Sequence, residues 1–371
     1  MHTPATLVRG GTSKCWLFSQ VHVPADRGEL EKLLVAAYGS TEPVVLDGVG
    51  GATPTTSKAA VVGVSRAPGV DVDYLFAQVG IGTGTVEWTS NCGNCATGIA
   101  LYAVAKGLVP ITGDRTRVVM RNSNTGAVLE GVVDTTGGRV HEFGEQRVPG
   151  TRAGGVAVGL TFLDPAGGTT GKLLPTGSPA DDLTLTGAES PHVSMVDAGA
   201  PVVLVDAGSA GRTGAEDLAR VRADVPWLRA VRHAAAPLMG LLPPDGEPGD
   251  AVPKVGLVGP PVPYTTTADE KVRADDYDVS VRMLSMNSPH PAIGLTSAVA
   301  VAAAGLREGS VVAAAAEGQS GPWLRIGTPA GVVAVRCDDV RDGVPGRVTV
   351  QRAARLLADA HIYVPEARRA S

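Results

Sequence analysis

The chain has 371 residues, of which 44% are hydrophobic and 19% charged, and its formal net charge at pH 7 is -5. This length favours two hydrophobic cores, and therefore two domains, over one. An acidic chain without a run of Lys and Arg lacks the phosphate contacts on which nucleic-acid binding depends, so we expect no nucleic-acid partner.

Secretory and membrane-spanning features are also missing from the sequence. The first residues lack the charged start, apolar middle and cleavage site of a signal peptide. The apolar run at 292–305 is shorter than the roughly 20 residues that cross a bilayer. The four cysteines are too few for a disulfide framework in a chain of this length. We therefore expect a cytoplasmic protein without membrane association.

The predicted elements alternate a few helices with short Val-rich strands. A helix is expected at 27–39, because Asp26 can cap its start and Gly39 can end it. A surface helix or helix pair is expected at 214–233, where Pro226 predicts a break or kink. Strands in largely antiparallel sheets are predicted for Val-rich runs between turn residues, at 58–64, 116–122, 155–163, 201–208, 254–260, 278–284 and 331–337.

Two further helices, at 94–107 and 292–305, are apolar nearly all round, which is typical of helices enclosed on every side. Each follows a short polar stretch, ends in Gly and is flanked by strands, which indicates a faint internal repeat. We expect an α+β fold of two pseudo-symmetric domains, each a largely antiparallel sheet curled round one buried helix. A turn-rich stretch favours a boundary after residue 187, which divides the chain into domains 1–187 and 188–371.

The starts of these two helices are candidate anion sites, because the first backbone N–H groups and the helix dipole favour a carboxylate. Cys92 lies at the first start, where a thiol is expected to have a lowered pKa and to serve as a base. The alternative is that Cys92 is a buried cysteine without a role. The polar neighbours Asn91 and Asn94 disfavour this alternative, because they are typical of a loop that approaches a polar group. His290 is expected to cap the second helix, with Pro291 at its first position, and a ligand contact and a structural role are both open for it.

Other motifs are less specific. Lys14 and Lys58 each follow a serine, but neighbours in an extended segment point to opposite faces, so we interpret them as cations for an acidic ligand and not as Ser-Lys hydrolase pairs. Cys92 and Cys95 form a C-x-x-C motif, as in dithiol oxidoreductases. A redox function is disfavoured because no βαβ pattern surrounds the motif, and a zinc site is disfavoured because no second pair supplies ligands. The glycine-rich runs match neither a dinucleotide fingerprint nor a phosphate loop. The sequence therefore predicts no metal and no cofactor.

Eight runs of the sequence resemble the PrpF family and follow one another in order over most of the chain. The family includes 2-methylaconitate cis-trans isomerase, 4-oxalomesaconate tautomerase and methylitaconate isomerase, and the resemblance implies a diaminopimelate epimerase-like fold with the active site between two domains. The runs are VRGGTSK (8–14), DGVGGATPTTSKAAVV (47–62), NCGN (91–94), SNTG (123–126), GKLLPTG (171–177), VSMVDAGAPVV (193–203), PKVGLV (253–258) and VRMLSMNSPHPAIGLTSAVAVAAA (281–304).

By this resemblance Lys58 and Cys92 match the catalytic pair. The epimerases use two opposed cysteines, whereas here the second helix start offers a histidine, which disfavours inversion by a thiol pair. The sequence departs from the family pattern at Cys15, where Gly normally follows GGTSK, and at Cys95, which follows NCGN. The positions expected near the substrate, including neighbours of the matched motifs, are Ser13, Lys14, Ser57, Asn91, Gly93, Asn94, Asn287, Ser288 and His290.

The resemblance thus predicts a cofactor-independent isomerase that shifts a C=C bond by a 1,3-proton transfer in a small unsaturated di- or tricarboxylic acid, such as an aconitate, methylaconitate or oxalomesaconate analogue. Two alternatives are an amino-acid epimerase or racemase on the same fold and a non-catalytic carboxylate-binding protein. The sequence leaves open which acid is used, whether Lys58 or Cys92 is the initial base, and whether the protein forms a homodimer.

Overall fold

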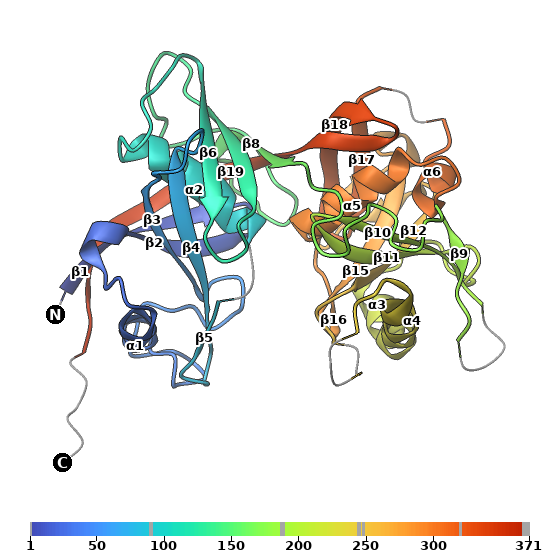
Figure 1. The fold of residues 1–371 in the computed structure, drawn as a ribbon, viewed down its shortest axis with the longest axis horizontal. Helices are drawn as coiled ribbons and strands as arrows, with labels where there is room; N and C mark the ends of the chain where they lie inside the picture. Colours follow the sequence, from blue (N-terminus) through green and yellow to red (C-terminus); the bar gives the residue numbers. More distant parts are fainter. Residues whose placement is uncertain are drawn as a thin grey trace. The chain divides into compact units, whose positions relative to one another are not determined.

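The protein divides into two compact units, which we call the first and second unit (Figure 1). The first unit contains Met1–Leu160 together with Arg352–Ser371, and the second contains Thr161–Gln351. The computed structural model describes residues 2–88, 92–185, 190–242, 246, 249–318 and 321–365.

This division differs from the expected single boundary after residue 187, because the chain returns to the first unit at its end. The last strand, β19 (Val344–Tyr363), pairs antiparallel with β18 (Gly331–Arg341) of the second unit through its first half. Its second half pairs antiparallel with β1 (His2–Gly10) of the first unit. One continuous strand therefore contributes to both units, which no local linker pattern can indicate.

The first unit is a mixed sheet with one enclosed helix. The pairs β1–β2, β3–β4, β4–β5 and β6–β7 are antiparallel, whereas β2–β3 and β4–β6 are parallel. Besides β1 and the second half of β19, its elements are β2 (Ser13–Ser19), η1 (Gln20–His22), α1 (Arg27–Tyr38), β3 (Lys58–Val64), β4 (Val72–Val79), β5 (Val86–Glu87), α2 (Gly93–Ala105), β6 (Arg115–Asn122), β7 (Val128–Asp134) and most of β8 (Val156–Leu163).

Helix α2 is the central helix of the first unit, as its apolar sequence predicts (Figure 1). Every residue from Cys95 to Val104 is buried, and the helix packs on β1, β2, β6 and β7. Strand β1 approaches its first turn very closely, since a Cβ at Gly10 would lie 1.9 Å from the backbone oxygen of Asn94. Only glycine permits this approach, which brings the β1–β2 turn next to the start of α2.

The expected helix at 27–39 is also confirmed. The Asp26 side chain accepts a hydrogen bond from the backbone N–H of Glu29, and Gly39 ends α1 with φ 63°. Its apolar side packs on the sheet through Leu30 and Leu34, which are both buried.

The second unit contains the rest of the mixed sheet, which is continuous through β19, and has its own enclosed helix. The β11–β12 and β15–β17 pairs are parallel and the other pairs of its main sheet are antiparallel. Its elements are β9 (Asp181–Asp182), β10 (His192–Ala198), β11 (Ala200–Asp206), α3 (Leu218–Ala223), α4 (Val225–Leu238), β12 (Lys254–Gly259), β13 (Tyr264–Thr265), β14 (Lys271–Val272), η2 (Ala274–Asp276), β15 (Val279–Ser285), β16 (Ser288–Pro289), α5 (Leu295–Gly305), α6 (Val311–Ala315), β17 (Trp323–Thr328), β18 and the first half of β19.

Helix α5 is buried along nearly its whole length and packs on β10, β11, β17 and β18. It begins later than the sequence predicts, with Gly294 in the capping position. The expectation that His290 caps this helix is wrong, because the chain stays extended there: β16 pairs with β15, and the His290 N–H donates to the Met283 carbonyl. No helix in the described ranges has the length and apolar character to cross a membrane.

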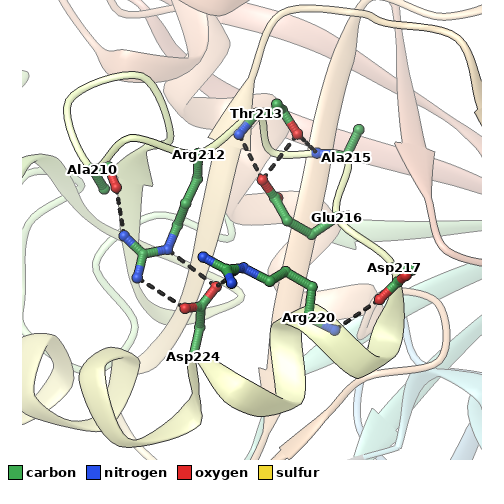
Figure 2. Close-up of polar contacts among 8 residues, drawn as sticks. All are labelled: Ala210, Arg212, Thr213, Ala215, Glu216, Asp217, Arg220 and Asp224. Atoms are coloured by element: carbon green, nitrogen blue, oxygen red, sulfur yellow. Dashed lines mark hydrogen bonds and ion pairs between the residues drawn. The ribbon is translucent and has the colours of Figure 1, made fainter.

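The expected helix at 214–233 is a pair, α3 and α4, that meets at Asp224, and Pro226 lies in the first turn of α4. Figure 2 shows how the pair is held. The Arg212 guanidinium donates to both Asp224 oxygens, at 3.1 and 2.9 Å, and Asp217 caps α3 by accepting from the Arg220 N–H at 2.7 Å. Asp224 is only 6% exposed, so its charge depends on these partners.

Candidate active site

Seven of the described residues expected at the site lie in the first unit, on or next to β2, β3 and the start of α2. Lys58 is the first residue of β3 and follows the buried Ser57, while Ser13 and Lys14 begin β2. Cys92 is the N-cap of α2, and Gly93 and Asn94 form its first turn. Asn91, another expected contact, lies outside the described residues.

Asn94 connects three elements at this point. Its Nδ2 donates to the Thr12 hydroxyl at 3.0 Å and to the Ser13 hydroxyl at 3.4 Å, both at the β1–β2 turn. Its Oδ1 accepts from Nη2 of Arg352, on β19, at 2.8 Å. The NCGN motif and the GGTSK motif are therefore brought together by one amide side chain, although they are about 80 residues apart in the sequence.

Lys58 is half-buried and has neutral neighbours. Its Nζ donates a short hydrogen bond to Oε1 of Gln78 and lies 5.2 Å from the centre of the Phe76 ring. Gln78 is the cross-strand partner of Lys58 on β4, and its own Nε2 donates to the Ser57 carbonyl at 2.8 Å. In the part of the chain that the structure describes, Lys58 forms no ion pair, so its charge is not neutralised by a carboxylate.

Cys92 is a half-buried thiol whose pKa is raised well above its ordinary value. The main cause is the hydrogen bond with the Cys95 thiol, followed by burial. The positive charge of Lys58 acts in the opposite direction but is a smaller effect. The expected lowering of the Cys92 pKa is therefore wrong, because the helix start is also an apolar site that contains a second thiol. The effect of Lys58 nevertheless indicates that the two side chains lie within electrostatic range of each other.

Of the remaining cysteines, Cys15 and Cys95 are buried and Cys337 is half-buried. Cys95 and Cys15 are 1% and 3% exposed, and burial is the main reason that the pKa of Cys95 is raised. Cys337 lies on β18 of the second unit, where burial raises its pKa to about 12. All four cysteines are free. Within the described ranges, no cluster of His, Cys, Asp and Glu has the composition to hold a metal ion.

Arg352 is a site residue that sequence reasoning missed. It is 4% exposed, and its buried Nε has no hydrogen-bond partner among the residues that the structure describes. Burial and the positive charge of Arg9 lower its pKa to about 10, while the charge of Cys92 acts in the opposite direction, so Arg352 and Cys92 are also within electrostatic range. In the sequence, the two arginines of QRAAR (351–355) are the feature that could have indicated an anion-binding residue. Arginines are mostly exposed, however, so this feature by itself favours surface positions.

The expected contacts of the second unit lie in and just after the β15–β16 hairpin. The side chain of Asn287 already has a hydrogen-bond partner within the protein, since its Nδ2 donates to the Asp250 carboxylate at 2.7 Å. Ser288 is exposed on β16. His290 is half-buried, and its Nδ1 accepts from the Ala292 N–H at 3.0 Å. This bond makes Nδ1 an acceptor, so a neutral His290 carries its proton on Nε2.

Comparison with solved structures identifies the class of protein. A crystal structure of methylitaconate-delta-isomerase superposes with a TM-score of 0.88 at 28% identity, covering 100% of this chain and 99% of the other. The α+β fold with its mixed sheet is thus the fold of an isomerase.

Sequence comparison identifies the family. Residues 1–365 match the family described as PrpF protein. The chain is 36% identical over 372 residues to (4E)-oxalomesaconate Delta-isomerase of Novosphingobium sp. strain KA1, with 97% of each chain covered. It is 34% identical over 391 residues to 2-methyl-aconitate isomerase of Cupriavidus necator, with 98% of this chain and 97% of the relative covered. The chain belongs to the PrpF family and is an isomerase.

Proposed function

We propose that the protein is a cofactor-independent isomerase that moves a C=C bond in a small unsaturated di- or tricarboxylic acid by a 1,3-proton transfer. The observation that carries the proposal is that an amine, Lys58, lies within electrostatic range of a thiol, Cys92, which caps a helix without an acidic residue in its first turn. Relatives named for oxalomesaconate, methylaconitate and methylitaconate support an acid of this kind as the substrate.

In the proposed reaction, one member of the pair removes a proton from the carbon next to the double bond. The electron pair of the broken C–H bond moves into a dienolate, whose negative charge spreads to a carboxylate. The other member returns a proton to the far carbon. Because the reaction is reversible, each group is the acid in one direction and the base in the other. The raised pKa of Cys92 favours the protonated thiol as the donor. Lys58 is then the group that removes the first proton, and as an ammonium it faces the dienolate that forms.

Cations around the site supply the stabilisation that such a dienolate needs. Lys58 has a neutral hydrogen-bond partner, and Arg352 is buried beside the first turn of α2. Positive groups that are fixed before the reaction stabilise developing negative charge without reorganisation. Ser13, Lys14, Ser57, Gly93 and Asn94 are proposed to contact the substrate, as are Ser288 and His290 of the second unit, on the basis of the family resemblance.

The two units also resemble each other in architecture. We propose that the two units are repeats of one design, since each wraps a mixed sheet around one apolar helix, α2 or α5. The start of α5 differs from that of α2 in lacking a thiol: the chain has four cysteines, and the one in the second unit, Cys337, is on β18. This difference favours double-bond migration over epimerisation by opposed cysteines.

The test is turnover of trans-aconitate and related unsaturated acids in deuterated water. An isomerase changes the ultraviolet absorbance of the conjugated acid and introduces deuterium at a carbon of the shifted bond. An epimerase instead exchanges the α-hydrogen of an amino acid without that absorbance change. We expect Cys92→Ser to keep the fold and to lower kcat by about 10²- to 10⁴-fold, the usual contribution of a positioned acid or base. Near-normal turnover by this variant would remove Cys92 from the mechanism.

A further inference from the structure

Three arginines of the first unit lie on two neighbouring strands and form what we call the arginine cluster. Arg9 is on β1, and Arg352 and Arg355 are on β19. Arg9 and Arg355 are direct cross-strand partners. Like charges in directly opposed positions destabilise a sheet, so this pairing is unfavourable unless another group compensates for it.

The described residues provide the arginine cluster with neutral partners. Arg9 donates to the carbonyls of Gly11 and Gly154, at 3.1 and 2.8 Å. Arg352 donates to the amide oxygen of Asn94, and Arg355 lies 5.0 Å from the centre of the Phe143 ring. No ion pair reaches any of the three arginines in the described part of the chain.

Arg352 is the member of the cluster whose isolation is most costly. Its side chain is 4% exposed, and none of the described residues supplies an acceptor for its Nε. A buried cation is unfavourable when no anion accompanies it, because the interior replaces little of the lost hydration. Burial and Arg9 lower its pKa to about 10, which still leaves it charged at neutral pH. When no ligand is bound, Arg352 therefore carries a buried positive charge that only an anion can balance.

The position of Arg352 connects this charge to the proposed chemistry. It contacts the first turn of α2, the 13-residue helix whose N-cap is Cys92. A planar guanidinium binds a carboxylate through two parallel hydrogen bonds, which fixes the orientation of the anion as well as its position. A carboxylate on Arg352 would also approach the positive end of the α2 dipole.

We propose that Arg352 binds a carboxylate of the substrate beside Cys92 and thereby selects polycarboxylates and orients the reacting carbon. The proposal rests on the proposed function for the identity of the substrate class. It assigns a binding role to a residue far along the chain from Lys58 and Cys92.

The experiment measures binding of tricarballylate, a saturated tricarboxylate that cannot isomerise, by titration calorimetry. We expect Arg352→Gln to weaken binding by about 10- to 100-fold, the usual effect of losing a charge-assisted hydrogen bond, and Arg352→Lys to weaken it less. The trimethyl ester of tricarballylate should not bind. Arg121→Gln is the matched control, because Arg121 is paired with Asp73 on the surface of the same unit, and it should bind like the wild type.

A second variant keeps the proposal testable if Arg352→Gln does not fold. Asn94→Asp keeps Arg352 and places a carboxylate on the atom that it already contacts, so this variant should also weaken tricarballylate binding while remaining folded. Thermal unfolding and circular dichroism verify the fold of every variant. Binding by both Arg352→Gln and Asn94→Asp equal to that of the wild type, or no binding by the wild type, would overturn the proposal.

Turnover separates this proposal from the proposed function. With an unsaturated acid that the wild type isomerises, Arg352→Gln should raise KM more than it lowers kcat. If no acid is isomerised but tricarballylate binding depends on Arg352, the proposed function fails and the binding role stands. If isomerisation is observed and Arg352→Gln leaves KM unchanged, the binding role fails and the isomerase stands.

Discussion

Lys58 of β3 and Gln78 of β4 are cross-strand neighbours, and the ammonium group of the lysine donates a hydrogen bond to the side-chain oxygen of the glutamine. A neutral acceptor orients the ammonium group without neutralising its charge. Gln78 is itself fixed by the bond from its Nε2 to the Ser57 carbonyl. The position of Lys58 is thus specified by the sheet, while its charge remains available to an anion.

Replacing Gln78 by Glu tests this arrangement. The new carboxylate should form an ion pair with Lys58 and compete with the substrate for its charge, so we expect kcat/KM to fall by about tenfold or more. Steady-state kinetics provide the measurement, with Gln78→Met as the control for lost hydrogen bonding. Equal values of kcat/KM for the Glu and Met variants would show that activity does not depend on an uncharged residue at position 78.

The raised pKa of Cys92 predicts slow alkylation near neutral pH. Only the thiolate reacts with iodoacetamide, so the rate of labelling should increase as the pH rises above 9. Lys58→Gln removes the charge that lowers this pKa, and it should move the pH profile of labelling further toward high pH. Mass spectrometry of peptides that contain Cys92 gives the rate at each pH.

The control for this experiment is Lys32→Gln, since Lys32 lies on the surface in a pair with Glu29. Its profile should match that of the wild type. Rapid labelling of the wild-type thiol at pH 6 would contradict the prediction, because it would require the low pKa that the site does not provide.

The Arg212–Asp224 pair should contribute strongly to the stability of the second unit. The Asp224 side chain is 8% exposed and that of Arg212 14%, so replacing Asp224 by Asn leaves a buried guanidinium without its counterion. We expect a loss of about 3 kcal/mol in the free energy of unfolding. Chemical denaturation monitored by fluorescence measures it.

The matched comparison is Asp276→Asn, which breaks the exposed pair with Arg273. Exposed pairs of this kind contribute about 0–1 kcal/mol, so the two variants should differ clearly. Equal losses would mean that burial of the Arg212–Asp224 pair does not determine its contribution.

Asp250 should make stability depend on pH in the acid range. Its pKa is lowered from 3.8 to about 2, first by the hydrogen bond from Asn287 and then by Arg229 and His233. A carboxyl group with a depressed folded-state pKa adds stability above about pH 4 and loses it as the pH falls toward 2. We expect Asp250→Asn to cost about 1–2 kcal/mol at pH 6, after allowance for its partial exposure, and almost nothing near pH 2.

Urea unfolding of the wild type and Asp250→Asn at pH 6, 4 and 3 checks this prediction. Asp217→Asn is unsuitable as a control because Asp217 caps α3, whereas Asp269→Asn changes a surface carboxyl of the same unit. A difference between the wild type and Asp250→Asn that stays constant from pH 6 to pH 3 would be incompatible with a pKa near 2.

Local patterns in the sequence predict much of the secondary structure. The apolar sequence of 94–107 identifies α2, Asp26 and Gly39 mark the ends of α1, and the run at 58–64 matches β3 residue for residue. The motifs around Lys58 and Cys92 were sufficient to indicate the family and its candidate residues. These features are local because helix periodicity, capping and strand propensity depend on residues close together in the chain.

Tertiary structure decided the features that depend on distant partners. The second half of β19 pairs with β1, which brings Arg352 to Asn94 across 258 positions of sequence. The pKa of Cys92 is raised because Cys95 and the surrounding core outweigh Lys58, and His290 stays extended because β16 pairs with β15. Motifs therefore indicated the family and its candidate residues. The burial and charge environment of these residues emerged only when strands from opposite ends of the chain packed together, since desolvation is a property of the folded core.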